Sequence, residues 1–258
     1  MCYAQPINGT PLPKRGRDVA VGMSRKNVKT ITDSYPQLLS LAVHEFRTPA
    51  SVVGGYLRML QRDTESPLSE RQRKMIDEAE KSCVRLVALI AELSELSKLD
   101  AGQVTLARQS LDVFTLVSEV AGLVQEARDR EVLLEVRGQK GGATMTGDIA
   151  RLRTAFDAIF RAILREKAGP VTVIADRRVE RREGGSTAVF VVAEEASVQA
   201  AYDRERGPFD EKRGGMGLAL PLARRVIEGH GGQIWSPAAN GENDPLTRGS
   251  VIVALPIG

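Results

Sequence analysis

The sequence has only two cysteines, no long apolar run and only a small excess of positive charge. Cys2 and Cys83 are too few for a disulfide framework, which indicates a reducing compartment. The longest apolar runs, such as Ala188 to Ala193, are far too short to span a bilayer, and the first residues contain no signal-peptide core. We therefore predict a cytoplasmic protein without a membrane span. The formal net charge of +3 gives no reason to expect nucleic acid as a partner.

The 258 residues suffice for one large domain or two of ordinary size, and 42% hydrophobic with 27% charged residues is typical of a globular protein. Residues 1–30 are polar and basic and show no sustained periodicity, which predicts a flexible basic tail. The pattern then changes twice. We predict a helical hairpin over residues 31–102 and a mixed α/β domain over residues 103–258.

Apolar residues alternate at spacings of three and four in two stretches of residues 31–102, which predicts two helices with one apolar seam each. The first seam contains Leu39, Ala42, Phe46, Ala50, Val53, Leu57 and Leu60, and the second contains Ile76, Ala79, Cys83, Leu86, Ile90 and Leu93. Residues 62–68 break the pattern, Ser69 with Gln72 forms a capping-box start, and Gly102 provides a stop.

Two helices joined by a short loop form an antiparallel hairpin, which is too narrow to enclose its apolar seams alone. A second copy would bury these seams in a four-helix bundle with two-fold symmetry, so we predict a homodimer. A hairpin that packs only on its own C-terminal domain is the alternative.

From about Val104 onward, short β-type runs alternate with helical stretches. We predict strands at residues 132–137, 171–177, 188–193 and 250–256, and helices at residues 112–128, 147–165 and 216–228. Residues 178–185 predict the turn of a β-hairpin, and residues 196–214 predict a long mobile loop. The expected fold class is thus α plus α+β, with the helices of the second domain on one face of a sheet.

His44 lies between the seam positions Ala42 and Phe46, so at about 100° per residue its side chain points away from the seam. Glu45 can accept a proton from one ring nitrogen while the other attacks, and a neutral imidazole is a good phosphoryl nucleophile. Thr48 follows one helical turn later, which places its hydroxyl beside the ring. The pattern fits a phosphoacceptor, and a plain surface histidine is the alternative.

The run Leu41-Ala-Val-His44-Glu45-Phe46-Arg47-Thr48-Pro49 resembles the phosphoacceptor motif of two-component sensor histidine kinases. In that family the histidine takes the γ-phosphoryl group of ATP and passes it to an aspartate of a response regulator. The resemblance implies that His44 is the phosphoacceptor, Glu45 the general base and Thr48 a residue that assists dephosphorylation of the regulator. It covers about residues 30–258 and implies a dimerisation hairpin followed by an α/β sandwich of the histidine-kinase ATPase type.

The glycine-rich run from Gly214 to Leu220 precedes a predicted helix and resembles the second glycine box of the same family. Glycines before a helix let backbone amides approach phosphates at its positive end. The resemblance implies nucleotide-binding roles for Glu194, Gly215, Gly217 and Leu218. Glu194 falls where the family has an aspartate that accepts the adenine amino group. His230 matches a position that ends the helix, and we predict a structural role for it.

Other parts of this nucleotide site depart from the family pattern. Residues 147–164 resemble the helix that holds magnesium through asparagine, but the two asparagine positions fall on Ala158 and Ala162, which offer no oxygen to Mg²⁺. Glu194 is one methylene longer than aspartate, and Ala196 replaces a glycine that would admit the base. We therefore predict a degenerate ATP-binding domain without metal ligands at these positions, and ATP with Mg²⁺ stays open as a cofactor.

Two functions follow from these residues. In the first, His44 exchanges a phosphoryl group with an aspartate of a response-regulator receiver domain, the donor is ATP or another phosphoprotein, and Thr48 allows the reverse, phosphatase direction. In the second, a pseudo-kinase binds a response regulator or a partner kinase without catalysis. The intact phosphoacceptor run favours the first. No sensor domain is visible ahead of the hairpin, so we expect the stimulus to come from an upstream sensor, a partner kinase or the tail.

Overall fold

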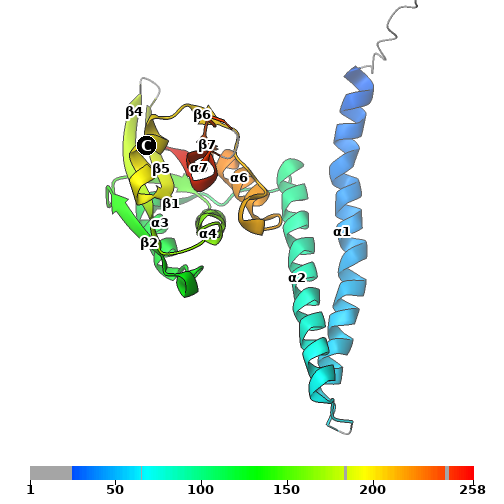
Figure 1. Cartoon of the computed structure of the whole chain (residues 1–258). Helices are drawn as coiled ribbons and strands as arrows, with labels where there is room; N and C mark the ends of the chain where they lie inside the picture. The colour runs from blue at the N-terminus through cyan, green and yellow to red at the C-terminus, as the bar shows by residue number, and fades with distance from the viewer. Residues whose placement is uncertain (1–24, 65, 183–184, 242–243) are drawn as a thin grey trace, which may run out of the picture.

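The computed structural model describes residues 25–64, 66–182, 185–241 and 244–258. These residues form a long helical hairpin and a mixed α/β domain that lies beside one of its helices (Figure 1). Most of the predicted tail lies outside the described residues, whereas residues 25–30 belong to the first helix of the hairpin.

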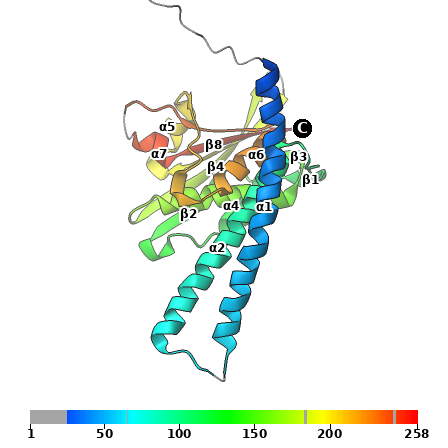
Figure 2. The same cartoon turned by 90° about the vertical axis from the view of Figure 1, so that its right-hand side faces the viewer.

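The hairpin consists of α1 (Arg25–Arg62) and α2 (Glu70–Asp100), whose lower ends are joined by a loop in Figure 2. Ser69 caps α2: its hydroxyl accepts the backbone N–H of Gln72 at 3.4 Å, and the side chain of Gln72 accepts the backbone N–H of Ser69 at 3.0 Å. This reciprocal pair satisfies N–H groups that have no partner inside the helix. The predicted capping box is therefore confirmed.

The second domain alternates helices with strands of a twisted sheet (Figure 1). In chain order its elements are β1 (Gln109–Asp112), α3 (Val113–Leu123), β2 (Val132–Gly138), β3 (Thr144–Gly147), α4 (Ile149–Arg165), β4 (Val171–Arg182), β5 (Gly185–Glu194), α5 (Val198–Asp203), β6 (Arg206–Gly207), α6 (Ala219–Gly229), β7 (Gln233–Pro237), α7 (Pro245–Gly249) and β8 (Val251–Ile257). The main sheet has the strand order β2-β4-β5-β8-β7-β6, and β1 pairs with β3 separately. Only β2 and β4 pair in parallel; the other recorded pairs are antiparallel.

Strand β5 divides the core of this domain into two layers because alternate residues point to opposite faces. Its even-numbered residues from 188 to 192 join the large core beneath α3, α4 and α6. There the ring of Phe190 lies 5.4 Å from that of Phe114 and 5.0 Å from that of Phe156, measured between centroids. The odd-numbered residues face a smaller cluster under α5 and α7. The predicted fold class is confirmed, with two short helices added on the second face.

Three local predictions differ from the structure. Residues 196–214 contain α5, β6 and a 3-10 turn at Arg213–Gly215, because apolar residues of α5 pack on the second face of the sheet. The turn predicted over residues 178–185 is shorter, since β4 continues to Arg182 and β5 begins at Gly185. The helix predicted over residues 112–128 ends at Leu123, and Ala127 soon after adopts the left-handed conformation, with φ of 60°.

In the described part of the chain, no helix combines the length and the hydropathy that a membrane span requires.

Candidate functional site

His44 lies on α1 with its ring in solvent. Its side chain is 78% exposed, and Nδ1 lies 3.3 Å from Oε1 of Glu45, whose side chain is 70% exposed. A carboxylate beside Nδ1 favours the tautomer that carries the proton there and leaves the Nε2 lone pair free. Thr48 is exposed one turn further along α1. The structure therefore brings the three predicted residues together on one exposed stretch of helix.

The opposite side of α1 is anchored on α2. Val43 and Ala50 are buried against Ile90, and Leu93 packs on this cluster. The thiol of Cys83 donates to the carbonyl oxygen of Ala50 at 3.1 Å. Because Val43 directly precedes His44, the buried side of the helix fixes the direction in which His44 projects.

A groove of about 200 Å³ lies between α1 and α2 below this histidine. Ser51 and Arg58 line it from α1, and Glu80 and Val84 line it from α2. His44, Ser51 and Arg58 recur at a spacing of seven residues, so they share one face of α1. The groove thus continues the exposed face that presents His44.

A separate face of the hairpin is apolar and uncovered in the single chain. Phe46, Val53 and Leu60 are 57%, 53% and 46% exposed, and their seven-residue spacing places them on one side of α1. Met75 and Leu86 of α2 are also exposed. The predicted seam is therefore split, because Ala50 packs inside the hairpin whereas Phe46, Val53 and Leu60 do not. Packing of the hairpin on its own C-terminal domain leaves these side chains uncovered.

The α/β domain contacts the C-terminal half of α2. The guanidinium group of Arg151 on α4 donates to Oε1 of Glu95 through two nitrogens, at 2.7 and 3.0 Å. Arg225 on α6 forms an ion pair with Asp100 near the end of α2. These pairs join both major helices of the domain to the hairpin.

The glycine turn before α6 also faces α2. Gly215 and Gly217 have φ angles of 59° and 65°, and a methyl group on Gly217 would lie 2.9 Å from Cδ2 of Leu89. The backbone N–H of Leu218 donates to Glu92, which offsets part of the rise that burial causes in the pKa of this carboxyl. The segment predicted to approach phosphates therefore engages the hairpin instead.

The positions predicted for magnesium ligands are covered by protein. Ala158 and Ala162 are 4% and 1% exposed on the inner side of α4. Gly214 lies directly on them: a Cβ atom at this glycine would be 2.6 Å from the carbonyl oxygen and 2.7 Å from the Cα atom of Ala162. Backbone thus touches backbone where the resemblance would place a metal-bound phosphate.

Glu194, at the predicted adenine position, is engaged by an internal cation. The Nζ atom of Lys167 lies 2.8 Å from Oε1 of Glu194, and the lysine side chain is only 8% exposed. Ala196 lies in the 3-10 turn that follows β5. With alanines at the ligand positions and Glu194 paired to lysine, the residues present do not fit a magnesium–nucleotide complex.

Residues 36–102 match the model of the His Kinase A (phospho-acceptor) domain, a range that contains His44 and all of α2. Sensor histidine kinases also align with most of the chain. Residues 36–102 are thus similar to a phospho-acceptor domain, and the chain resembles sensor histidine kinases over most of its length.

The curated relatives of this chain are much longer proteins. The circadian input-output histidine kinase CikA of Synechococcus elongatus is 27% identical over 223 residues, which cover 82% of this chain. Sensor protein GacS of Pseudomonas syringae is 24% identical over 88% of the chain, and sensor protein DivL of Caulobacter vibrioides is 27% identical over 79%. The chain spans 29%, 26% and 26% of the lengths of these three proteins.

Solved structures of histidine kinases share the fold. Full-length ShkA in complex with AMPPNP aligns with a TM-score of 0.64 at 21% identity, over 86% of this chain and 46% of that one. ThkA in complex with the response regulator protein TrrA aligns with a TM-score of 0.51 at 20% identity, over 90% of this chain and 65% of that one. The order of a helical hairpin followed by an α/β domain is therefore that of histidine kinases.

The structural role predicted for His230 agrees with its contacts, but other polar contacts of the α/β domain were not predicted. Nε2 of His230 accepts the backbone N–H of Asp148 at 2.9 Å, and Nδ1 lies 2.7 Å from the carbonyl oxygen of Val226, so the ring joins α6 to the start of α4. Arg213, which is 3% exposed, and Lys167 were not predicted. Both lie outside the family motifs used for prediction, and no local pattern marks either side chain as buried.

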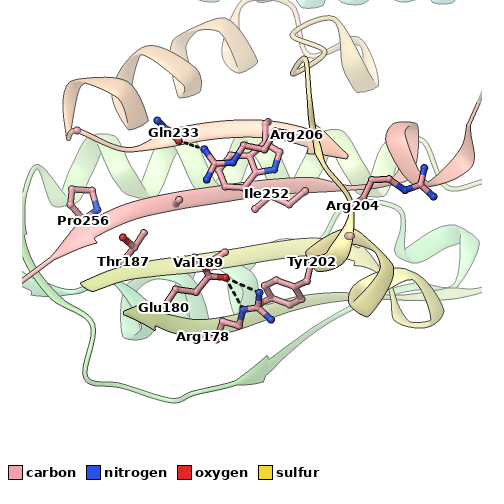
Figure 3. Close-up of a pocket in the computed structure, with 14 residues that line it drawn as sticks. Arg178, Glu180, Thr187, Val189, Tyr202, Arg204, Arg206, Gln233, Ile252 and Pro256 are labelled. Carbon is pink, nitrogen blue, oxygen red and sulfur yellow. Dashed lines mark hydrogen bonds and ion pairs between the residues drawn. The ribbon is translucent and has the colours of Figure 1, made fainter. Parts of the chain in front are cut away.

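A pocket of about 300 Å³ lies on the second face of the sheet (Figure 3). Arg178 stacks over the ring of Tyr202 at 3.4 Å from its centroid and pairs with Glu180 at 2.7 Å, and Arg206 stacks over Trp235 at 4.1 Å. The large helices α4 and α6 cover the opposite face, so this pocket is separate from the predicted nucleotide region.

Proposed function

We propose that this protein is a two-component phosphotransfer protein in which His44 exchanges a phosphoryl group with an aspartate of a response-regulator receiver domain. The observation that carries the proposal is the exposed His44–Glu45 pair, which lies within the range that matches a phosphoacceptor domain. A scaffold without chemistry is not favoured, because such a role needs neither a free histidine nitrogen nor an adjacent carboxylate.

The chemistry needs only the hairpin and the receiver. The Nε2 lone pair of His44 attacks the phosphorus of an aspartyl phosphate, the N–P bond forms, the O–P bond breaks, and the aspartate leaves as a carboxylate. Glu45 shares the Nδ1 proton and so stabilises the cationic phosphohistidine ring. The reverse step passes the group to a receiver aspartate. In the phosphatase direction, Thr48 positions water on the receiver's aspartyl phosphate.

The cofactor differs between the family and this chain. A histidine kinase of the same fold was solved with AMPPNP, and ATP with Mg²⁺ is used in the family. The transfer proposed for this chain proceeds without nucleotide, because His44, Glu45 and the phosphorylated receiver supply every atom that reacts. A cytoplasmic location is part of the proposal and is supported by the free, buried thiol of Cys83.

The partner surface proposed for the receiver is the groove between α1 and α2. ThkA, which has the same fold, was solved in complex with a response regulator. In this chain the groove continues from His44 and contains Val84, an apolar side chain that is 58% exposed. The homodimer uses the other face, with Phe46 and Val53, so both interactions can occur together.

The test is transfer from a receiver domain that carries ³²P on its aspartate. Wild-type protein is expected to take up label that is labile in acid and stable in alkali, as phosphohistidine is, and label should leave the receiver at the same rate. Label that is lost from the receiver only as inorganic phosphate would favour phosphatase action alone. A receiver that keeps its label, across a panel of receivers, would refute phosphotransfer.

Replacing Val84 with lysine is expected to slow transfer about tenfold or more, because a charge enters the apolar part of the docking surface. Val52→Lys is the matched control, since Val52 is 52% exposed but does not line the groove. Initial rates of label transfer at subsaturating receiver should fall for Val84→Lys only, while both variants stay dimeric. Equal rates for the two variants would place the receiver elsewhere.

A further inference from the structure

We propose that the C-terminal domain is closed to nucleotide by its own backbone and side-chain packing, so that a phosphorylated receiver domain supplies the phosphoryl group to His44. The second half of this inference rests on the function proposed above, whereas the first half does not. A reaction that phosphorylates a receiver aspartate must then precede the step carried out by this protein.

Arg213 ties the segment before α6 to three other parts of the domain. Its guanidinium group donates to the carbonyl oxygens of Ser250 and Thr247, both at 2.8 Å, and to Oγ of Ser236 at 3.2 Å. Its Nε atom lies 3.6 Å from a carboxylate oxygen of Glu166 at the end of α4. A buried arginine with this many partners is a structural cross-link, because removing it from its acceptors would leave a desolvated charge.

Partial burial acts on both members of this ion pair. Burial lowers the pKa of the Arg213 guanidinium and raises the pKa of the Glu166 carboxyl, and the attraction between the two groups offsets part of both changes. The backbone N–H of Gly214 also donates to Glu166, at 3.3 Å. The end of α4 and the segment before α6 are thus bonded to each other directly.

Backbone packing closes the region next to this ion pair. Gly214 has φ of 62° and contacts the main chain of Ala162 closely enough to exclude even a methyl group. A phosphate, which is larger than a methyl group, does not fit between these two backbone segments either. Glycine at 214 is therefore the residue that allows this close backbone contact.

At the adenine end, Glu194, whose side chain is 45% exposed, is already paired within the chain. The Nζ atom of Lys167 neutralises Glu194, and a Cβ atom at Gly249 would lie only 3.0 Å from that nitrogen. A base that bonds to Oε1 of Glu194 would displace this buried ammonium group, which would lose its carboxylate partner. Internal cations thus engage a carboxylate at each end of the expected nucleotide site: Arg213 pairs with Glu166, and Lys167 pairs with Glu194.

Nucleotide binding is tested first on the wild-type 258-residue protein, with ATP or AMPPNP and Mg²⁺ at about 1 mM. A nucleotide bound with a Kd of about 10 µM would raise Tm by roughly 5–10 °C. We expect no shift, and no acid-labile label from γ-³²P-ATP. A saturable rise of several degrees, or ATP-derived label on His44, would overturn the inference. Uptake of label from a phosphorylated receiver by the same preparation shows that the protein is folded and competent.

A pair of glycine variants tests closure itself without any ligand. Gly214 and Gly215 both have positive φ, so Gly214→Ala and Gly215→Ala share the strain of a left-handed alanine. Only position 214 lacks space, since nothing lies within 4 Å of a Cβ atom at Gly215. We expect Gly214→Ala to lower Tm by at least about 5 °C more than Gly215→Ala. Equal losses would mean that the segment stands open and would overturn the closed arrangement.

The two proposals fail separately in these experiments. If nucleotide does not bind and no receiver labels His44 either, closure of the domain is supported. In that case the phosphotransfer function is wrong, and so is the receiver domain as phosphoryl donor. If nucleotide binds while receivers still label His44, phosphotransfer stands and closure is wrong.

Discussion

Replacing His44 with glutamine is expected to abolish phosphohistidine formation, with a loss of at least about 1000-fold in the rate of label uptake. Glutamine matches part of the imidazole in size and polarity, but its amide nitrogen has no nucleophilic lone pair. The substitution lies on the exposed face of α1 and removes only one side-chain contact, that with Glu45, so Tm should change little. The measurement is acid-labile ³²P from a phosphorylated receiver domain.

The chain contains one other histidine, which provides the matched control. His230→Gln should retain label uptake although it weakens the junction of α6 with α4, where His230 bonds to Asp148 and Val226. Glu45→Gln should slow uptake by about 100-fold, the ordinary contribution of a general base. Label on the His44→Gln variant, or an equal loss in the His230→Gln variant, would contradict the assignment of His44.

The parts of this site that the sequence predicts are those set by local physics. Helix periodicity places His44 outside the seam, and adjacency alone brings Glu45 to its ring. The capping box of Ser69 and Gln72 is likewise a contact across three residues. Such features depend on one helix, so the pattern of a short stretch is enough to predict them.

Contacts between residues that are far apart in the sequence could not be predicted from local patterns. Arg213 reaches residues between 23 and 37 positions further along the chain, and Lys167 reaches Glu194 across 27 positions. The sequence shows that ligand asparagines are missing, but only the fold shows which groups lie in their place. The short helix α5 was missed for a related reason, since it is stabilised by packing on the second face of the sheet rather than by its own length.

The apolar seam predicted for α1 combines two different faces of the helix. Spacings of three and four mark every apolar side of a helix, so the pattern merged two faces into one. The structure separates Val43 and Ala50, which pack on α2, from Phe46 and Val53, which are exposed in the single chain. The second face therefore needs a partner, and the phosphoacceptor domain implies that this partner is another copy.

Replacing Val53 with aspartate is expected to raise the Kd of the homodimer by at least about 1000-fold. Val53 is 53% exposed in the single chain and lies between Phe46 and Leu60 on the apolar face of α1. Burying an unpaired carboxylate there costs at least about 2 kcal/mol. Because each of the two symmetric subunits carries the substitution, the free energy of dimerisation becomes about 4 kcal/mol less favourable. The measurement is sedimentation equilibrium over a wide range of protein concentrations.

Ser51→Asp is the control for this dimer experiment because it adds the same charge to the same helix two residues away. Ser51 lies on the groove side of α1, which the proposed dimer leaves open, so the Kd of the Ser51→Asp protein should stay near that of wild type. A dimer that tolerates Val53→Asp would show that the apolar face of α1 is not its interface. Dissociation by Ser51→Asp instead would place the interface on the side of His44, where it would compete with the receiver domain.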